Sequence, residues 1–318
     1  MLSRVAERLY WMARYLERTE CSARVCNAYS HLVLDLPKGE ELGWQVLVNV
    51  IDGGNSFSQR YQRVDERNVM KFIILDKDNF GSIASSVTSA RENLRTTRDA
   101  LPADGWEHVN ELYLFVQNMN DKSLSRRRRH EYLSDIIQRN QQINGLLASS
   151  VARDRAFTFL KLGQLIERLD MTSRVIDVAC LAIAEKDSRA ASVVPLLWAS
   201  VLKAVSAHSA YRREVGPLID ADQVIEFVCL HSKFPRSLNY CLSSLEQVLS
   251  FLDNNKKSTT IVRQLRASIV NDTLAPDKLH GFIDNFQAEL ASLHDSITAS
   301  WFGVSDLNQP AQKSLFTQ

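Results

Sequence analysis

Apolar and small residues recur along the first stretch of the chain in alternating steps of three and four. The positions are Leu2, Val5, Leu9, Met12, Leu16, Thr19, Ala23 and Cys26. Because an α-helix has 3.6 residues per turn, this spacing places all of them on one face of a helix. The pattern therefore predicts one long helix that begins near residue 2 and ends before Pro37.

Similar patterns predict more helices in the first part of the chain, at residues 42–51, 65–75, 79–101, 106–119 and 130–150. The cluster Asp52-Gly53-Gly54-Asn55 breaks or kinks the chain after the second helix, and the basic run Arg126–Arg129 precedes the last. Only 11 Gly and 7 Pro occur in 318 residues, too few for the many turns of a sandwich or barrel. The predicted fold class is all-α, a helical bundle.

The chain also contains an internal repeat. Residues 16–25 align with residues 166–175, and both follow the pattern aliphatic-E-R-x-acid-x-hydroxyl-x-R-V. Further matches in the same order pair residues 44–48 with 198–202, 69–75 with 224–230, 90–95 with 245–250 and, more weakly, 132–150 with 279–297. Because order and spacing both hold, we interpret the bundle as a duplicated helical unit with two tandem, pseudo-symmetric halves.

The repeat defines the expected domain organisation. We predict one domain over residues 1–302, with halves at about 1–150 and 151–302, and an irregular tail at 303–318. The polar stretch at 253–260 is typical of a flexible loop.

Composition narrows the function classes. The formal net charge of +1 provides no field that would draw the chain to nucleic acid or to an anionic membrane. The five cysteines form no C-x-x-C pair, so they indicate neither a zinc site nor a disulfide framework. No run approaches the roughly 20 apolar residues that span a bilayer, and acidic residues interrupt the first helix where a signal core would lie. We expect a cytoplasmic protein without metal or cofactor.

The repeated motif supplies the candidate site residues. They are Glu17, Arg18, Glu20, Arg24, Glu167, Arg168, Asp170 and Arg174. At 100° per residue, the first, third and fourth residue of each set fall in one arc beside the apolar face, whereas the Arg after each Glu points to a different side. Gly163 occupies the place that Ala13 has in the first half, and such small residues let another helix approach closely.

Three interpretations of this cluster remain open. The residues form buried ion pairs that join the halves, with Glu17 meeting Arg174. Alternatively, Arg24 and Arg174, with Arg18 or Arg168, grip a carboxylate or phosphate in a polar pocket, because the planar guanidinium matches such anions. A pair of metal ions held by the carboxylates is the third, but di-metal bundles use Glu-x-x-His and neither motif has that histidine, so we predict no metal.

These motifs resemble those of the bacterial alpha-E family, a helical domain named for its ER motif. The resemblance rests on residues 2–18 (LSRVAERLYWMARYLER) and residues 159–168 (FLKLGQLIER), and it extends from Leu2 to about Phe302. Two positions depart from the family: Phe157 stands where members often have tryptophan, and Cys21 where asparagine or another polar residue is common. Ligand preference could differ here if either residue lines a pocket.

The resemblance implies a stand-alone alpha-E protein, of the kind encoded beside a circularly permuted ATP-grasp protein and a transglutaminase-like protease. Such groupings resemble systems that make or trim peptide-like amide bonds. They imply a partner of the amide ligase. Our leading hypothesis is a non-enzymatic or accessory protein that binds the ATP-grasp ligase or its peptide-like product through the paired Glu-Arg helices.

Two further hypotheses compete with the accessory role. One is an enzyme for acyl or amino-group transfer in which Glu17 or Glu167 is the general base; this requires a carboxylate with a raised pKa in a dry pocket. The other is a structural scaffold or homodimer, in which the motif supplies only ion-pair staples.

Overall fold

The computed structural model describes residues 1–51, 53–120, 124–184, 192–271, 274 and 276–303. In these residues the secondary structure is helical and no strand occurs, which confirms the all-α prediction. The helices are α1 (Ser3–Asp35), α2 (Gln45–Val50), α3 (Gly54–Arg60), α4 (Glu66–Ile74), α5 (Ile83–Arg95), α6 (Ala103–Gln117), α7 (Arg126–Ser150), α8 (Arg155–Ala184), α9 (Val194–Ala204), α10 (His208–Glu214), α11 (Ala221–Leu230), α12 (Leu238–Leu249), α13 (Lys256–Asn271) and α14 (Pro276–Ile297). A short 3₁₀ turn, η1 (Arg98–Ala100), and a π-helical turn, η4 (Thr298–Phe302), complete the set.

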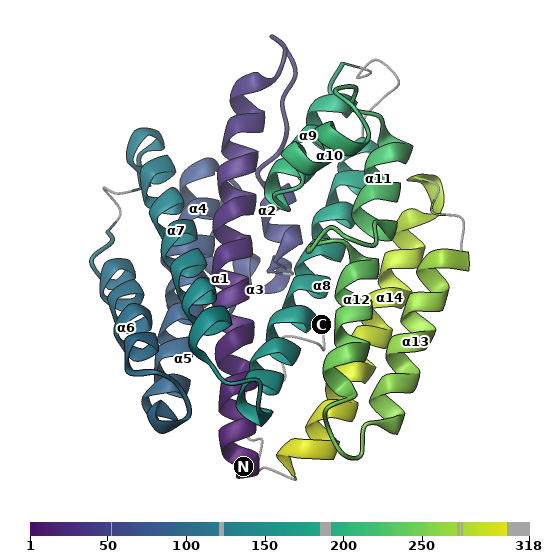
Figure 1. The fold of residues 1–318 in the computed structure, drawn as a ribbon. Coiled ribbons are helices and arrows are strands. Elements are labelled where there is room, and N and C mark those ends of the chain that lie inside the picture. Colours follow the sequence, from purple (N-terminus) through teal and green to yellow (C-terminus); the bar gives the residue numbers. More distant parts are fainter. Residues whose placement is uncertain (52, 121–123, 185–191, 272–273, 275, 304–318) are drawn as a thin grey trace.

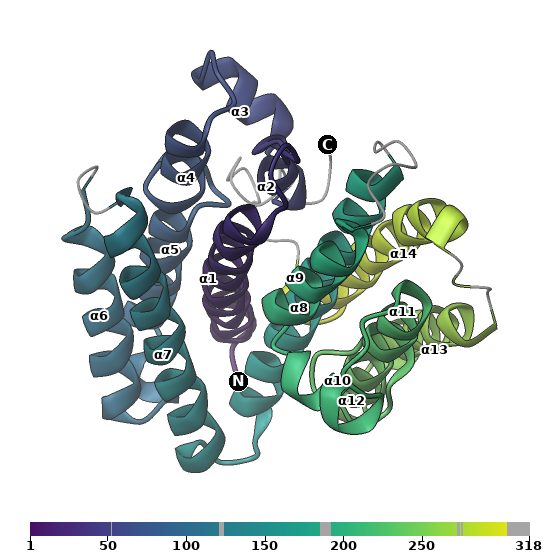
Figure 2. The same cartoon turned by 90° about the horizontal axis from the view of Figure 1, so that it is seen from above.

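The two longest helices, α1 and α8, form the centre of the molecule and pack against each other (Figure 1). Figure 2 shows α4 to α7 on one side of this pair and α10 to α14 on the other. Among the described residues, no helix combines the length and the apolarity that crossing a membrane requires.

The contacts on the two sides correspond. Helix α1 packs on α5 and α7, as α8 packs on α12 and α14, and α6 bridges α5 and α7 as α13 bridges α12 and α14. The second helix of each half also reaches the central helix of the other, since α9 packs on α1 and α2 on α8. These parallels support the tandem-half interpretation, which stays a prediction.

Helix starts are fixed by local hydrogen bonds at matching places. Asp65 accepts a hydrogen bond from the backbone amide of Asn68 at the start of α4. Asp220 accepts one from the backbone amide of Gln223 at the start of α11. Ser82 and Ser237 cap α5 and α12 in the same way. Such caps satisfy amides that have no partner inside the helix, and each typically contributes about 1 kcal/mol.

The two central helices approach each other closely at one glycine. A Cβ atom built on Gly163 would lie 2.1 Å from the carbonyl oxygen of Tyr10. Because this obstacle is backbone, no side-chain rotation could relieve the clash. The absence of a side chain at position 163 therefore permits the contact between α1 and α8, as expected for a small residue there.

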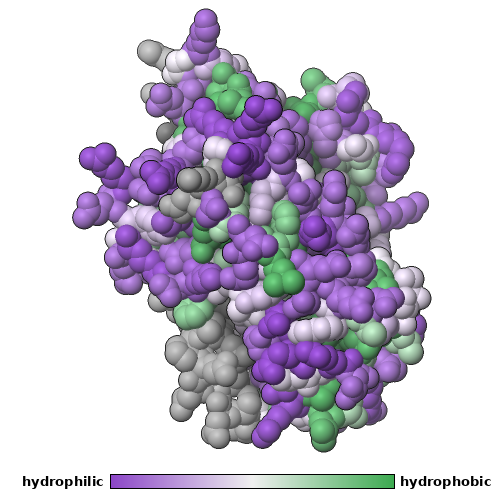
Figure 3. All heavy atoms as spheres, turned by 90° about the vertical axis from the view of Figure 1, so that its left-hand side faces the viewer, coloured by the Kyte–Doolittle hydropathy of each residue, from purple (hydrophilic) through white to green (hydrophobic). Residues whose placement is uncertain are grey.

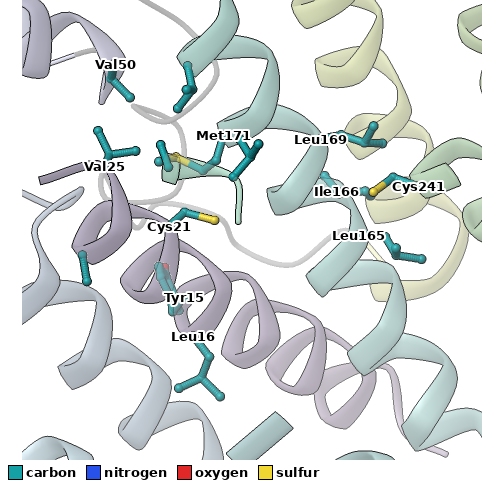
Figure 4. Close-up of a cluster of buried hydrophobic side chains, with 14 of the residues drawn as sticks. Tyr15, Leu16, Cys21, Val25, Val50, Leu165, Ile166, Leu169, Met171 and Cys241 are labelled. Carbon is teal, nitrogen blue, oxygen red and sulfur yellow. The ribbon is translucent and has the colours of Figure 1, made fainter. Parts of the chain in front are cut away.

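The core surrounds α1 and α8 on several sides. Most residues of α1 between Leu9 and Cys26 are buried, in contrast to the single buried face of an ordinary surface helix. In Figure 4, Ile166 and Leu169 of α8 lie near Cys241 of α12, while Cys21 and the other labelled residues of α1 lie on a separate helix nearby. All five of the chain's cysteines are free and buried.

Several predicted boundaries differ from the observed ones. Helix α7 includes the basic run 126–129 that we placed before it, because two of these arginines pair with Glu66 at the start of α4. Helix α5 begins at Ile83 rather than at residue 79, because Ser82 caps it. The expected loop at 253–260 is wrong in its second part, since α13 begins at Lys256. Asp52 and most of the predicted tail lie outside the described residues.

Candidate functional site

The Glu-Arg motifs of α1 and α8 meet in the centre of the bundle, and each glutamate pairs with the arginine of the other motif. Arg168 donates from Nε and Nη2 to the two carboxylate oxygens of Glu17, both at 2.8 Å. Arg18 donates from Nε to Oε1 of Glu167 at 2.5 Å. The glutamates are 1% and 0% exposed. The repeated motif therefore forms a reciprocal pair of ion pairs across the α1–α8 contact.

This pairing differs from the one the sequence suggested. The helical-wheel argument placed Arg18 and Arg168 away from the acids and joined Glu17 to Arg174. Instead, Arg174 donates to Asp170 on its own helix, at 2.9 Å. The helical wheel gives only the direction in which a residue leaves the helix axis. A long arginine side chain can reach around its helix to an acid on a neighbouring helix, so the wheel did not predict the partner.

Two further arginines complete the network, and sequence reasoning missed both. Arg14 donates from Nε to Oε2 of Glu167 at 2.7 Å. Arg236, just before α12, donates to Glu17 and to Glu20, each at 2.8 Å. Arg14 lies one helical turn before Arg18, which is a signal that could have revealed it. Arg236 is remote in sequence, and only the fold brings it to the motif.

The outer ends of the network are pairs within one helix. Glu20 accepts from Arg24 at 2.9 Å, and Asp170 accepts from Arg174 four residues later. Each of these two arginine side chains is 14% exposed. Both arginines therefore turn toward an acid of their own helix, and the anion-pocket hypothesis stays untested.

Buried charge sets the protonation of the network. Burial opposes ionisation of Glu17, but Arg168 and Arg236 outweigh it and hold the pKa of that carboxyl well below its usual range. Glu167 is likewise buried, and Arg18 and Arg14 lower its pKa. Both groups are therefore carboxylates at neutral pH. A lowered pKa is the opposite of what the general-base hypothesis requires.

Arginines outnumber acids here. The network holds six arginines and four carboxylates, contributed by the eight predicted residues together with Arg14 and Arg236. The surplus positive charge opposes binding of a cation, which argues against the di-metal hypothesis at this place.

A buried histidine adjoins the network. The Tyr10 hydroxyl lies 2.7 Å from Nδ1 of His294, on α14, and Nη1 of Arg14 lies 3.5 Å from the same nitrogen. Burial and the charge of Arg14 lower the pKa of His294 to about 3, and burial raises the pKa of Tyr10 to about 12. Both side chains are therefore neutral at pH 7, and the hydrogen bond between the hydroxyl and Nδ1 ties α1 to α14.

One group of side chains away from the motif has the composition of a metal site. Asp177, His280 and Asp284 bring their ligand atoms within 4.8 Å of one another. The hydrogen bond at its centre, between Asp177 and Nδ1 of His280 at 2.7 Å, recurs in the first half between Asn27 and His130 at the same distance. The shared feature is a hydrogen bond between two helices, and an amide serves it as well as a carboxylate.

Comparison with known proteins identifies the family. A family model called Alpha-E, described as a predicted α-helical domain with a conserved ER motif, matches residues 1–302. The chain belongs to the Alpha-E family. Within the matched residues, the Glu-Arg dipeptides at 17–18 and 167–168 form the buried Glu17–Arg168 and Glu167–Arg18 pairs.

Uncharacterised proteins from Mycobacterium bovis and from two strains of Mycobacterium tuberculosis are similar to this Alpha-E chain. Each is 23% identical over 337 aligned residues, which cover 98% of the chain and 37% of the relative. The chain therefore spans little more than a third of the length of these curated relatives. No solved structure matches it.

Proposed function

We propose that this Alpha-E chain is an accessory helical protein of a system that forms peptide-like amide bonds, and that it binds a circularly permuted ATP-grasp ligase or the peptide-like product of that ligase. The reciprocal ER pairing is the observation that supports an accessory role instead of a catalytic one. The charged groups that define the motif are buried and paired with one another, so they hold α1 against α8 and leave the surfaces of the bundle to bind the partner.

The lengths of the mycobacterial relatives support a role together with a partner protein. In the mycobacterial proteins the region similar to this chain accounts for 37% of the length, so that region adjoins a larger amount of other chain. This is consistent with a domain that works with a partner. The identity of that partner as an ATP-grasp ligase rests on the family resemblance.

One face of the molecule is suited to bind a partner through polar contacts. The face of the molecule that carries α6 and α7 is mainly hydrophilic, with small and separate apolar areas (Figure 3). A partner that docked there would be recognised by charged and polar side chains, as in transient interfaces, and binding would weaken as salt concentration rises.

The proposal is tested with the purified chain and the ATP-grasp protein encoded beside it. We expect the two to form a complex in isothermal titration, and the chain to change the rate or the length distribution of the ligase products. Glu246→Gln, which alters an exposed ion pair, serves as the control variant and should behave like wild type. A chain that neither binds the ligase nor changes its products would contradict the proposal.

The same material tests the competing enzyme hypothesis. Turnover of acyl or amino-group substrates by the isolated chain, lost in Glu17→Gln while the helical circular-dichroism spectrum is kept, would assign catalysis to the motif. The lowered pKa values of Glu17 and Glu167 lead us to expect no such turnover.

A further inference from the structure

A small pocket lies beside the ER network, where α1, α7 and α8 meet. Its apolar walls include Leu16 of α1, Leu147 of α7, and Phe157 and Leu160 of α8. The cavity has a volume of about 20 Å³, which is room for one water-sized or methyl-sized group.

One cationic side chain lines this apolar pocket. Lys161 is half-buried, and its Nζ donates to Oε1 of Gln164 at 2.8 Å and lies 5.8 Å from the centre of the Phe157 ring. Within the described part of the chain, no carboxylate forms an ion pair with it. Burial and the nearby Arg168 lower the pKa of this ammonium group. A partly dehydrated positive charge beside apolar walls is complementary to an anion.

A chain of hydrogen bonds, each donated toward the ER network, leads away from Lys161. Because Oε1 of Gln164 accepts from the lysine, its Nε2 donates onward to Oδ1 of Asn144, at 3.1 Å. Asn144 in turn donates to Glu20 of the ER network, at 3.3 Å. Each amide therefore has one fixed acceptor for its NH2 group. Lys161 is the charged donor among these groups, and its remaining hydrogens can meet a ligand.

We propose that this pocket binds a small carboxylate, with the Lys161 ammonium on the carboxylate and a methyl-sized aliphatic group in the cavity. A phosphate would satisfy the charge but has no aliphatic group to fill the apolar space. The natural source is the carboxyl end of a peptide-like product with a small last side chain. This assignment of the source rests on the proposed function, whereas the pocket itself does not.

The test uses three probes on the isolated chain at constant ionic strength, with binding followed by NMR titration. N-acetylalanine mimics a peptide carboxyl end, propionate is a free small acid, and N-acetylalaninamide has the same shape as the first without its charge. We expect saturable binding of N-acetylalanine, weaker binding of propionate, and at least roughly tenfold weaker binding of the amide, because a charge-assisted hydrogen bond is lost. Tighter binding of propionate would assign the pocket to a free acid instead of a peptide end.

Two variants remove different parts of the pocket. Lys161→Gln should lower the affinity for N-acetylalanine at least roughly tenfold, and Lys38→Gln, at an exposed lysine, should leave it unchanged. Ala148→Phe, at an exposed position on the rim, should close the pocket with the charge intact and abolish binding.

The proposal is overturned if wild type shows no saturable binding of either acid up to about 50 mM, an affinity limit below that of ordinary weak ligands. Equal binding by wild type and Lys161→Gln, or equal binding of the acid and the amide, would also overturn it. Because no ligase is present, failure here leaves partner binding untouched, and failure of the partner experiment leaves this result standing.

Discussion

The substitution Glu167→Gln tests the ER network most directly. Glu167 is 0% exposed and its two oxygens accept from Arg14 at 2.7 Å and from Arg18 at 2.5 Å. Glutamine keeps the size of the side chain but removes the charge and replaces one acceptor oxygen with a donor. Two buried guanidinium groups would then share one neutral acceptor.

The expected cost follows from this loss of charge. Breaking a buried ion pair by removing one partner typically costs 3–5 kcal/mol, and here two cations lose the same partner, so we expect a decrease of about 4 kcal/mol or more in the free energy of unfolding. Single domains have about 5–15 kcal/mol in total. The melting temperature should fall by roughly 10 °C, using the few degrees per kcal/mol that are typical of larger domains.

Guanidinium denaturation followed by circular dichroism measures this change. Glu246→Gln is the matched control, because Glu246 is 28% exposed and pairs with an exposed arginine, so its loss should cost less than about 1 kcal/mol. Adding Arg18→Met to Glu167→Gln should recover part of the stability, since one of the uncompensated charges is removed. If Glu167→Gln cost no more than the control, the claim that this network holds α1 against α8 would be wrong.

Three other outcomes are expected. Gly163→Ala should lower the free energy of unfolding by roughly 1–3 kcal/mol or more, because its methyl group would meet the Tyr10 carbonyl, and a wild-type denaturation midpoint would contradict the close approach. Arg174→Ala, which removes the partner of one acid on its own helix, should cost less than Arg236→Ala, which takes a partner from both Glu17 and Glu20, a ranking that thermal melts can check. The pKa of His294 is near 3 in the folded chain and ordinary in the unfolded chain, so between these pH values the unfolded chain binds one more proton. The free energy of unfolding should therefore fall by about 1.4 kcal/mol per pH unit as the pH drops from 6.5 toward 3. His294→Asn should flatten that part of the stability–pH curve.

The sequence determined the parts of this protein that depend on neighbours along the chain. Steps of three and four apolar residues gave the long first helix, which ends at Asp35 just before Pro37 as predicted. The scarcity of glycine and proline gave the all-α class, and the paired motifs gave the eight charged residues and the small residue at the helix crossing. These features follow from helical geometry and local composition, which are properties of short segments.

Only the tertiary structure decided which charges meet. Two helices that are 150 residues apart bring Glu17 to Arg168 and Glu167 to Arg18, and the start of α12 adds Arg236. An arginine side chain is long enough to reach acids on several sides of its helix, so its direction on a helical wheel does not select a partner. The partner is selected by burial, because a charge at the centre of a bundle must be compensated by whatever opposite charge the packed helices place beside it.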